Sequence, residues 1–253
     1  MVEKTREMIR GYQRLEIGKN IVSCPYYMNV AKRSVVSLLE KAGVFGNGIE
    51  KFSLLWKQAA VDFGRFQGKG LPEEIALAAL QISKKIGLSI ENAEPATAVE
   101  VMKHLGLGID CSGFVFNVLK YAFGSSGGLG EFMDGLDWAD TDKRDASRAG
   151  VFVFAGKASY VVEASSLRGL DLLLMRGLSG KYTHIALLLA TGEDEFEVAQ
   201  STLLAVPTGI NLSRMKVVGL NPVFEFTPGL GKRWEEIFAE GRIEFRRLVA
   251  LNG

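Results

Sequence analysis

The sequence predicts an α+β fold in which a mainly helical first half packs against an antiparallel sheet built from the second half. Two observations predict this. Before residue 125, apolar residues recur with helical spacing between capping and stop residues. After residue 150, short apolar or alternating runs are separated by glycine turns, which is typical of strands. With 253 residues, of which 47% are hydrophobic, the chain can bury a substantial core as one large domain or as one domain with an insertion.

Four helices are expected before residue 105. They cover residues 30–42, 49–66, 72–85 and 96–104. The third begins at Pro72, with the acidic Glu73 and Glu74 in its first turn. The basic residues Lys84 and Lys85 occupy its last turn, so the charges follow the order that the helix dipole favours.

The second half is expected to form a series of strands. They lie near residues 151–155, 171–176, 183–190, 195–201, 210–218 and 243–250, with a short helix at 234–239 between the last two. The turn that begins at Gly192 joins the strands at 183–190 and 195–201 in a hairpin, because the run after it alternates polar and apolar residues.

His184 is a polar ring in an otherwise apolar strand, so it needs a partner. A three-residue loop in the hairpin places on its face the residues Phe196, Val198 and Gln200. A two- or four-residue loop places there the residues Glu197, Ala199 and Ser201. We favour the three-residue loop, because it sends Glu195 and Glu197 outward to water and leaves Gln200 to orient the imidazole.

Cys111 stands at the start of an apolar helix, directly after Asp110. The helical spacing is set by Phe114, Val115, Val118, Leu119 and Ala122. Asp110 is therefore the expected N-cap. The free N–H groups and the dipole of a helix start favour a thiolate over a thiol, and the same donors could hold the oxyanion of an attacked carbonyl. The alternative is a buried structural cysteine beside a glycine, Gly113, that only permits close packing.

Three stretches together resemble the NlpC-type bacterial cysteine peptidases. They are Asp-Cys-Ser-Gly-Phe-Val at residues 110–115, Gly-Leu-Asp-Leu-Leu at 169–173 and His-Ile-Ala at 184–186. The catalytic residues of this family follow one another along the chain in the order cysteine, histidine and a third polar residue, and the same order is present here. The resemblance implies a papain-like fold in which the nucleophile helix packs on an antiparallel sheet. It also implies an activity that cuts peptide bonds in cell-wall stem peptides.

Further segments extend this resemblance. They are the strands at 208–212 and 242–247 and the dipeptide Pro25-Tyr26, which is similar to the family's Pro-Tyr element, whose tyrosine lines the active site. In the family this element usually lies shortly before the cysteine, whereas here a long stretch stands between them. We therefore expect a segment that joins the catalytic core, a helical insertion and the NlpC-type core itself, at residues 1–27, 28–108 and 109–253.

The residues and the resemblance together predict acyl transfer by a thiol. Cys111 is the expected nucleophile, His184 takes or shares its proton, and Gln200 fixes the ring tautomer through the far nitrogen. Ser201 and Glu197 are rival candidates for the third position. The side chains expected to bind the substrate are those of Tyr26, Asp110 and Ser112. The predicted reaction is hydrolysis of an amide bond in a peptide or isopeptide, for example a cell-wall fragment. The alternatives are an acyltransferase or deamidase with the same pair, and a binding module on the same fold.

The charge pattern gives little support to other classes of partner. The 30 Lys and Arg residues are balanced by 29 Asp and Glu residues, and no basic stripe is interleaved with aromatic residues, so we expect no nucleic acid. The first residues include Glu3 and Glu7, no apolar segment of signal-peptide length follows, and no later run could span a bilayer. We therefore expect a cytoplasmic protein with no membrane partner, and the presence of only two cysteines fits a reducing compartment.

A metal or another cofactor is not expected. The histidines and cysteines, which are Cys24, His104, Cys111 and His184, match no common zinc spacing. His104 precedes a helix stop and is expected to contact helix-end carbonyls. We interpret Lys69, which stands between two glycines, as part of a turn.

Overall fold

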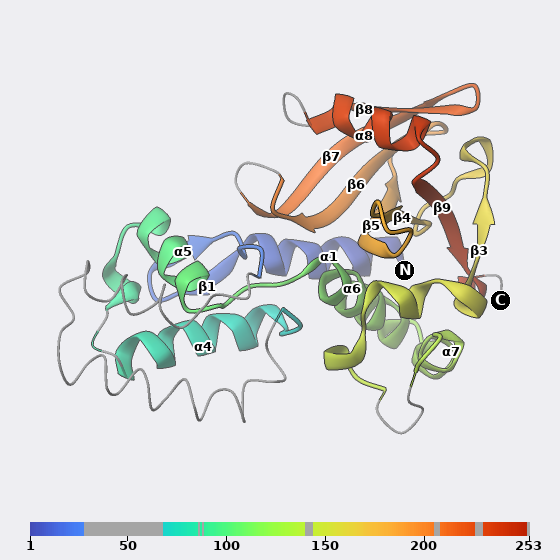
Figure 1. Ribbon diagram of the computed structural model, residues 1–253. Helices are drawn as coiled ribbons and strands as arrows, with labels where there is room; N and C mark the ends of the chain where they lie inside the picture. Colours follow the sequence, from blue (N-terminus) through green and yellow to red (C-terminus); the bar gives the residue numbers. More distant parts are fainter. Residues whose placement is uncertain are drawn as a thin grey trace.

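A computed structural model of the chain describes residues 1–27, 68–85, 87, 89–139, 144–204, 208–225 and 230–251 (Figure 1). Its α-helices are α1 (Val2–Gln13), α4 (Pro72–Lys85), α5 (Pro95–His104), α6 (Cys111–Ser125), α7 (Leu129–Gly135) and α8 (Leu230–Ala239). Its strands are β1 (Leu15–Ile17), β2 (Asn20–Val22), β3 (Ser159–Val162), β4 (Leu172–Arg176), β5 (Tyr182–Ala190), β6 (Glu195–Thr202), β7 (Gly209–Val218), β8 (Asn221–Glu225) and β9 (Ile243–Leu248). The helices expected at 30–42 and 49–66 lie outside the described residues.

The α+β class expected from the sequence is confirmed. Helices α4 and α5 and strands β4 to β7 and β9 stand where the spacing predicts them. The prediction of a strand at 151–155 is wrong. Residues Val151–Phe154 form a 3-10 helix, in which the Val153 carbonyl accepts a hydrogen bond from the Asp137 N–H (2.9 Å) instead of pairing with a strand. The sequence patterns also do not reveal α1, the β1–β2 hairpin or the edge strands β3 and β8.

Seven strands form one antiparallel sheet in the order β3-β9-β4-β5-β6-β7-β8. Figure 1 shows α1 and α6 below this sheet and α8 above it. Because side chains alternate along a strand, β5 contributes to both faces. Ile185 and Leu187 belong to the core shared with α6 and α1, whereas Ala186 and Leu188 belong to the core shared with Trp234 of α8. The sheet therefore separates two apolar layers.

Three extended segments meet just before α6. Ile109 pairs with Tyr26 and also with Gly68 and Lys69. Its backbone N–H and carbonyl each form a hydrogen bond of 3.1 Å with the residues on either side of Tyr26. Upstream of this junction, the β1–β2 hairpin packs against α4 and α5. Segments that are far apart in the sequence are thus held together two positions before Cys111.

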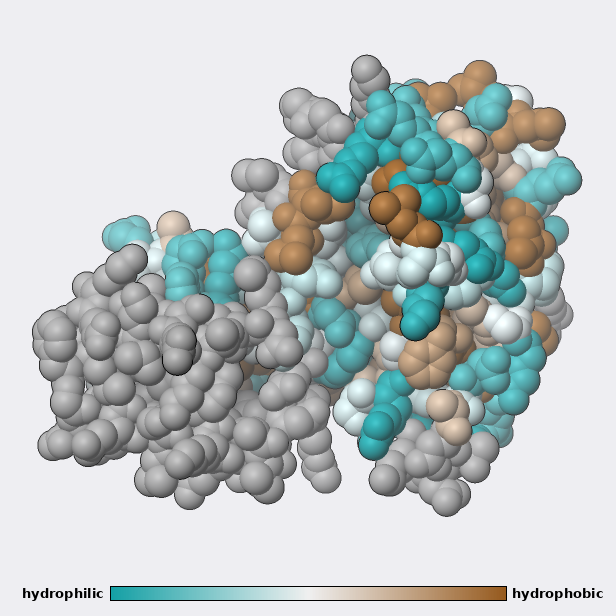
Figure 2. Space-filling model, viewed as in Figure 1, coloured by the Kyte–Doolittle hydropathy of each residue, from teal (hydrophilic) through white to brown (hydrophobic). Residues whose placement is uncertain are grey.

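Exposed apolar side chains are scattered over the surface. The most exposed ones, Leu178, Val218 and Leu220, lie in or beside turns between strands. On the face shown in Figure 2, the brown apolar groups are separated by teal hydrophilic ones. Single exposed apolar residues of this kind are common in folded proteins. Within the described residues, no helix has the length and apolar character that crossing a membrane requires.

Candidate active site

Cys111 is the first residue of α6, and Asp110 caps the helix. The Asp110 Oδ1 atom accepts hydrogen bonds from the Gly113 N–H (2.7 Å) and from the Ser112 hydroxyl (3.1 Å). The helix begins here because the aspartate satisfies a free N–H group and because Phe114 starts a run of buried apolar residues. The N-cap expected from the sequence is confirmed.

Cys111 is only 5% exposed, and burial is the main reason why its pKa is raised to about 11. The Asp110 carboxylate raises the pKa further, because it repels a thiolate. The backbone N–H groups of Ile185 and Ser112 and the ammonium of Lys69 lower it. The expectation that the helix start makes a thiolate is therefore wrong, because desolvation and the carboxylate outweigh these donors. At neutral pH the group is a thiol, which needs a base to become a nucleophile.

His184 lies half-buried near the start of β5, edge-on to the ring of Trp234, with 5.7 Å between the ring centroids. Its Nε2 atom is 2.8 Å from the Gln200 Oε1 atom. Since a carbonyl oxygen only accepts, the proton of the neutral ring is on Nε2, and Nδ1 keeps a lone pair that can take a proton. Burial lowers the His184 pKa, and the bond to Gln200 partly opposes this. The imidazole is therefore neutral at pH 7.

The β5–β6 hairpin has the three-residue loop that we favour from the sequence. The Thr191 N–H donates to the Glu195 carbonyl (2.8 Å), so residues 192–194 form the loop. This register places Gln200 on the same face as His184. Gln200 is fully buried, and among the described residues its Nε2 atom has no hydrogen-bond partner.

The two rival candidates for the third position contact other parts of the protein. The Ser201 hydroxyl donates to the Ile109 carbonyl (2.7 Å) on the α6 side of the sheet. Glu197 is half-buried in an ion pair with Arg6 of α1. The expectation that Glu197 points to water is wrong, because α1 lies against it and the sequence patterns do not reveal α1. Gln200 is the candidate whose side chain contacts His184.

The end of this hairpin lies beside the start of α6. The ladder between β5 and β6 covers Leu187–Ala190 and Phe196–Ala199, and beyond it the His184–Gln200 bond joins the two strands. By alternation His184 belongs to the α8 face of the sheet, whereas α6 lies on the opposite face. Even so, the backbone N–H of the next residue in β5 acts on the Cys111 sulfur. The backbone of Ile185, which follows His184 in β5, is therefore the part of this strand that contacts the thiol.

Tyr26 lies beside the segment that carries the nucleophile. It is half-buried and pairs with Ile109, two positions before Cys111. Burial raises the pKa of the Tyr26 hydroxyl above its usual value, and the charges of Cys111 and Asp110 add to this. The hydroxyl therefore keeps its proton and can donate a hydrogen bond. The structure brings Tyr26 and Cys111 together although a long stretch of chain separates them.

The sequence interpretation missed the side chain of Lys69. Its ammonium donates to Asp110 Oδ1 (2.8 Å), to Ser112 Oγ (2.6 Å) and to the Ala149 carbonyl (2.9 Å). These partners are 41 to 80 positions away in the chain, so a lysine between two glycines gives no local signal of them. The substrate contacts expected of Asp110 and Ser112 stay predictions, and in the structure both side chains bind Lys69.

The remaining histidine and cysteine are His104 and Cys24. His104 Nδ1 is 2.7 Å from the Glu100 carbonyl of the same helix, so the expected contact with a helix carbonyl is confirmed. Cys24 and Cys111 are both free thiols, and Cys24 is completely buried. In the part of the chain that the structure describes, no three His, Cys, Asp or Glu residues are grouped as a metal ion requires.

Comparison with protein-family models finds no family that matches this chain, and comparison with curated proteins finds no match.

Proposed function

We propose that this protein is a cysteine hydrolase that cleaves an amide bond in a peptide or isopeptide through a thioester intermediate. The observation that carries the proposal is the His184–Gln200 hydrogen bond on a strand whose next residue, Ile185, contacts the thiol at the start of α6. It orients a base for the thiol at the helix N-terminus, and nucleophilic catalysis by cysteine needs such a base. The same arrangement supports an NlpC-type core with a papain-like fold.

The contacts of Cys111 and His184 support a general-base mechanism. His184 Nδ1 takes the proton of the Cys111 thiol as the sulfur attacks the carbonyl carbon. The Cys111 backbone N–H and the Tyr26 hydroxyl stabilise the oxyanion. The C–N bond then breaks, and the imidazolium gives its proton to the leaving amine. Water, deprotonated by the same nitrogen, hydrolyses the thioester, which releases the acid and restores the thiol.

One observation favours a second candidate function. A thiol that is 5% exposed, with a pKa raised to about 11, is also what a structural cysteine in a non-catalytic binding module would show. The two proposals differ in what His184 does. In the hydrolase, His184 assists the loss of the Cys111 proton, whereas in the binding module it only packs against Trp234 and Gln200.

Alkylation by iodoacetamide distinguishes these two functions, with the modified cysteine identified by mass spectrometry. In the hydrolase, Cys111 reacts at pH 7.5 at least about tenfold faster than Cys24, and His184→Ala removes most of this difference. Cys24 is an internal control, because it is buried and has no histidine contact in the described residues. Similar slow labelling of both cysteines, unchanged by His184→Ala, would refute the hydrolase and support the binding module.

Turnover is tested with a mixture of peptides and isopeptides, including cell-wall stem peptides, with Cys111→Ala as the inactive control. New amine termini that appear with the wild type only support hydrolysis. Addition of an amine acceptor separates the hydrolase from an acyltransferase, since a transferase forms a new amide product. The cytoplasmic location stays a prediction of the sequence.

A further inference from the structure

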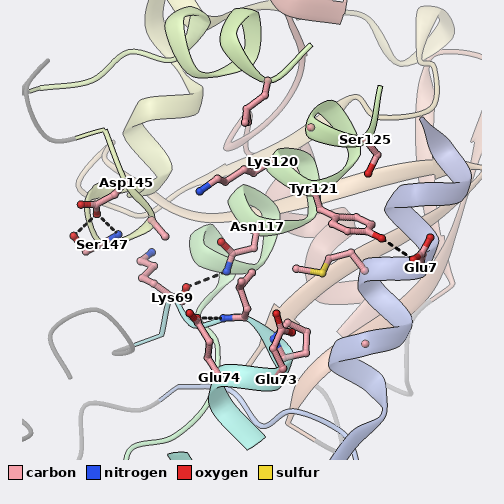
Figure 3. Close-up of a pocket in the computed structure, with 17 residues that line it drawn as sticks. Glu7, Lys69, Glu73, Glu74, Asn117, Lys120, Tyr121, Ser125, Asp145 and Ser147 are labelled. Carbon is pink, nitrogen blue, oxygen red and sulfur yellow. Dashed lines mark hydrogen bonds between the residues drawn. The ribbon is translucent and has the colours of Figure 1, made fainter. Parts of the chain in front are cut away.

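Lys69 is held more firmly than a turn residue requires. Its side chain is 10% exposed, and its ammonium makes three hydrogen bonds, to Asp110, Ser112 and Ala149. Its backbone carbonyl accepts a fourth from the Asn117 amide (3.0 Å), which Figure 3 shows at the edge of a pocket of about 890 Å³. Both ends of this lysine are therefore bound to the first two turns of α6.

The segment around Lys69 lies unusually close to the start of α6. The Asp110 N–H donates to the Gly68 carbonyl (3.0 Å). A Cβ atom added to Gly113 would lie 2.2 Å from that carbonyl oxygen and 2.7 Å from the Lys69 Cδ atom. Only glycine at position 113 permits this approach without a shift of the backbone. The glycine in the Asp-Cys-Ser-Gly stretch thus makes room for the lysine.

The placement of this charge calls for an explanation. A cation near a helix N-terminus is opposed by the helix dipole, and Asp110 already caps the helix through the Gly113 N–H without help from a lysine. Burying an ammonium is costly unless it is paired and hydrogen-bonded, as this one is. Two of the three groups that accept hydrogen bonds from this ammonium belong to Asp110 and Ser112, which are the two neighbours of Cys111 in the chain.

We propose that Lys69 is a positioning residue of the candidate active site, which fixes the two neighbours of Cys111 and balances the charge of Asp110 beside the thiol. This proposal rests on the proposed function, because it concerns the reactivity of the same cysteine. Without the lysine, Asp110 stays as an unbalanced negative charge that disfavours the thiolate. The loss of the cation and the loss of the partner of the anion both disfavour the Cys111 thiolate.

The test measures the rate of Cys111 alkylation by iodoacetamide between pH 7 and 10 in four variants. Lys69→Met keeps an apolar stem but removes the charge, and it should slow the reaction about tenfold at each pH, which corresponds to a rise of about one pH unit in the thiol titration. Lys69→Arg should keep the rate within about twofold of the wild type, because it keeps the charge. Lys120→Met is the control, since it removes an exposed lysine from α6, the helix that begins at Cys111, and should change nothing.

The fourth variant combines Lys69→Met with Asp110→Asn. Asparagine still caps a helix, and no buried charge is left unpaired. Since the carboxylate raises the thiol pKa more than the ammonium lowers it, this variant should react at least as fast as the wild type. A purely structural lysine would give lower thermal stability with an unchanged pH profile, and that result would overturn the proposal.

If Lys69→Met does not fold, the double variant decides, and a rate tenfold below that of the wild type counts against the proposal. The hydrolase and this inference fail separately. The response of Cys111 to His184→Ala tests the hydrolase, and the response to the Lys69 variants tests the positioning role.

Discussion

Gly113→Ala should destabilise the protein although alanine is the better helix former. The added Cβ atom would meet the Gly68 carbonyl oxygen at 2.2 Å, so the backbone of residues 68–69 has to move. That movement weakens two hydrogen bonds of 3.0 Å, from the Asp110 N–H to Gly68 and from the Asn117 amide to Lys69. Each is worth about 1 kcal/mol, overpacking costs a further ~1–3 kcal/mol, and the helix propensity of alanine returns about 1 kcal/mol. The expected net loss is about 2–4 kcal/mol.

Thermal unfolding followed by circular dichroism measures this loss. For a chain of this size, 1 kcal/mol changes Tm by about 2–4 °C, so Gly113→Ala should lower Tm by roughly 4–16 °C. Gly124→Ala is the matched control in the same helix, because a Cβ atom there would meet nothing within 4 Å. The control should keep or slightly raise Tm. If Gly113→Ala melts as high as Gly124→Ala, the close approach of residues 68–69 is not what position 113 requires.

The other predictions concern the reacting groups. Cys111→Ala should abolish turnover in the peptide assay while Tm stays near that of the wild type, because removal of one sulfur leaves a small cavity; loss of folding would instead indicate a structural cysteine. Gln200→Ala should lower kcat about 10- to 100-fold with little change in KM, and an unchanged kcat would remove Gln200 from the mechanism. Tyr26→Phe should lower kcat about 100-fold without a change in Tm, which a full rate in the variant would contradict. Because burial holds the His184 pKa below its usual value of about 6.5, protonation favours the unfolded chain. The stability that neutral His184 contributes is complete above pH 6.5 and is lost as the pH falls below it, so urea midpoints should fall less between pH 7.5 and 5 in His184→Gln than in the wild type.

The features that depend on local sequence could be predicted. The N-cap at Asp110 follows from a short-range hydrogen bond, and the hairpin register follows from the alternation of its own two strands. These signals involve residues a few positions apart or residues in one hairpin. They were therefore sufficient to identify Gln200 as the partner of His184.

The features that depend on tertiary contacts could not be predicted. Lys69 meets Asp110 only because the fold brings distant segments together, and the direction of the Cys111 pKa shift depends on how deeply the thiol is buried. Glu197 follows an alternating pattern that points to water, but α1 covers it with Arg6. The run at 151–155 has strand-like residues without a neighbouring strand to pair with, and it forms a 3-10 helix instead.

The junction at Ile109 also has a consequence for biosynthesis. The hydrogen bond from Ser201 to Ile109 spans 92 residues, and the ion pair from Lys69 to Asp110 spans 41. Contacts of such long range close large loops and form only after much of the chain has collapsed. During translation, Cys111 emerges from the ribosome well before His184 and Gln200 have been synthesised. A nascent or truncated chain therefore carries Cys111 as an isolated thiol without its folded surroundings. The alkylation rate of Cys111 then differs between the unfinished and the folded chain, and it reports whether folding is complete.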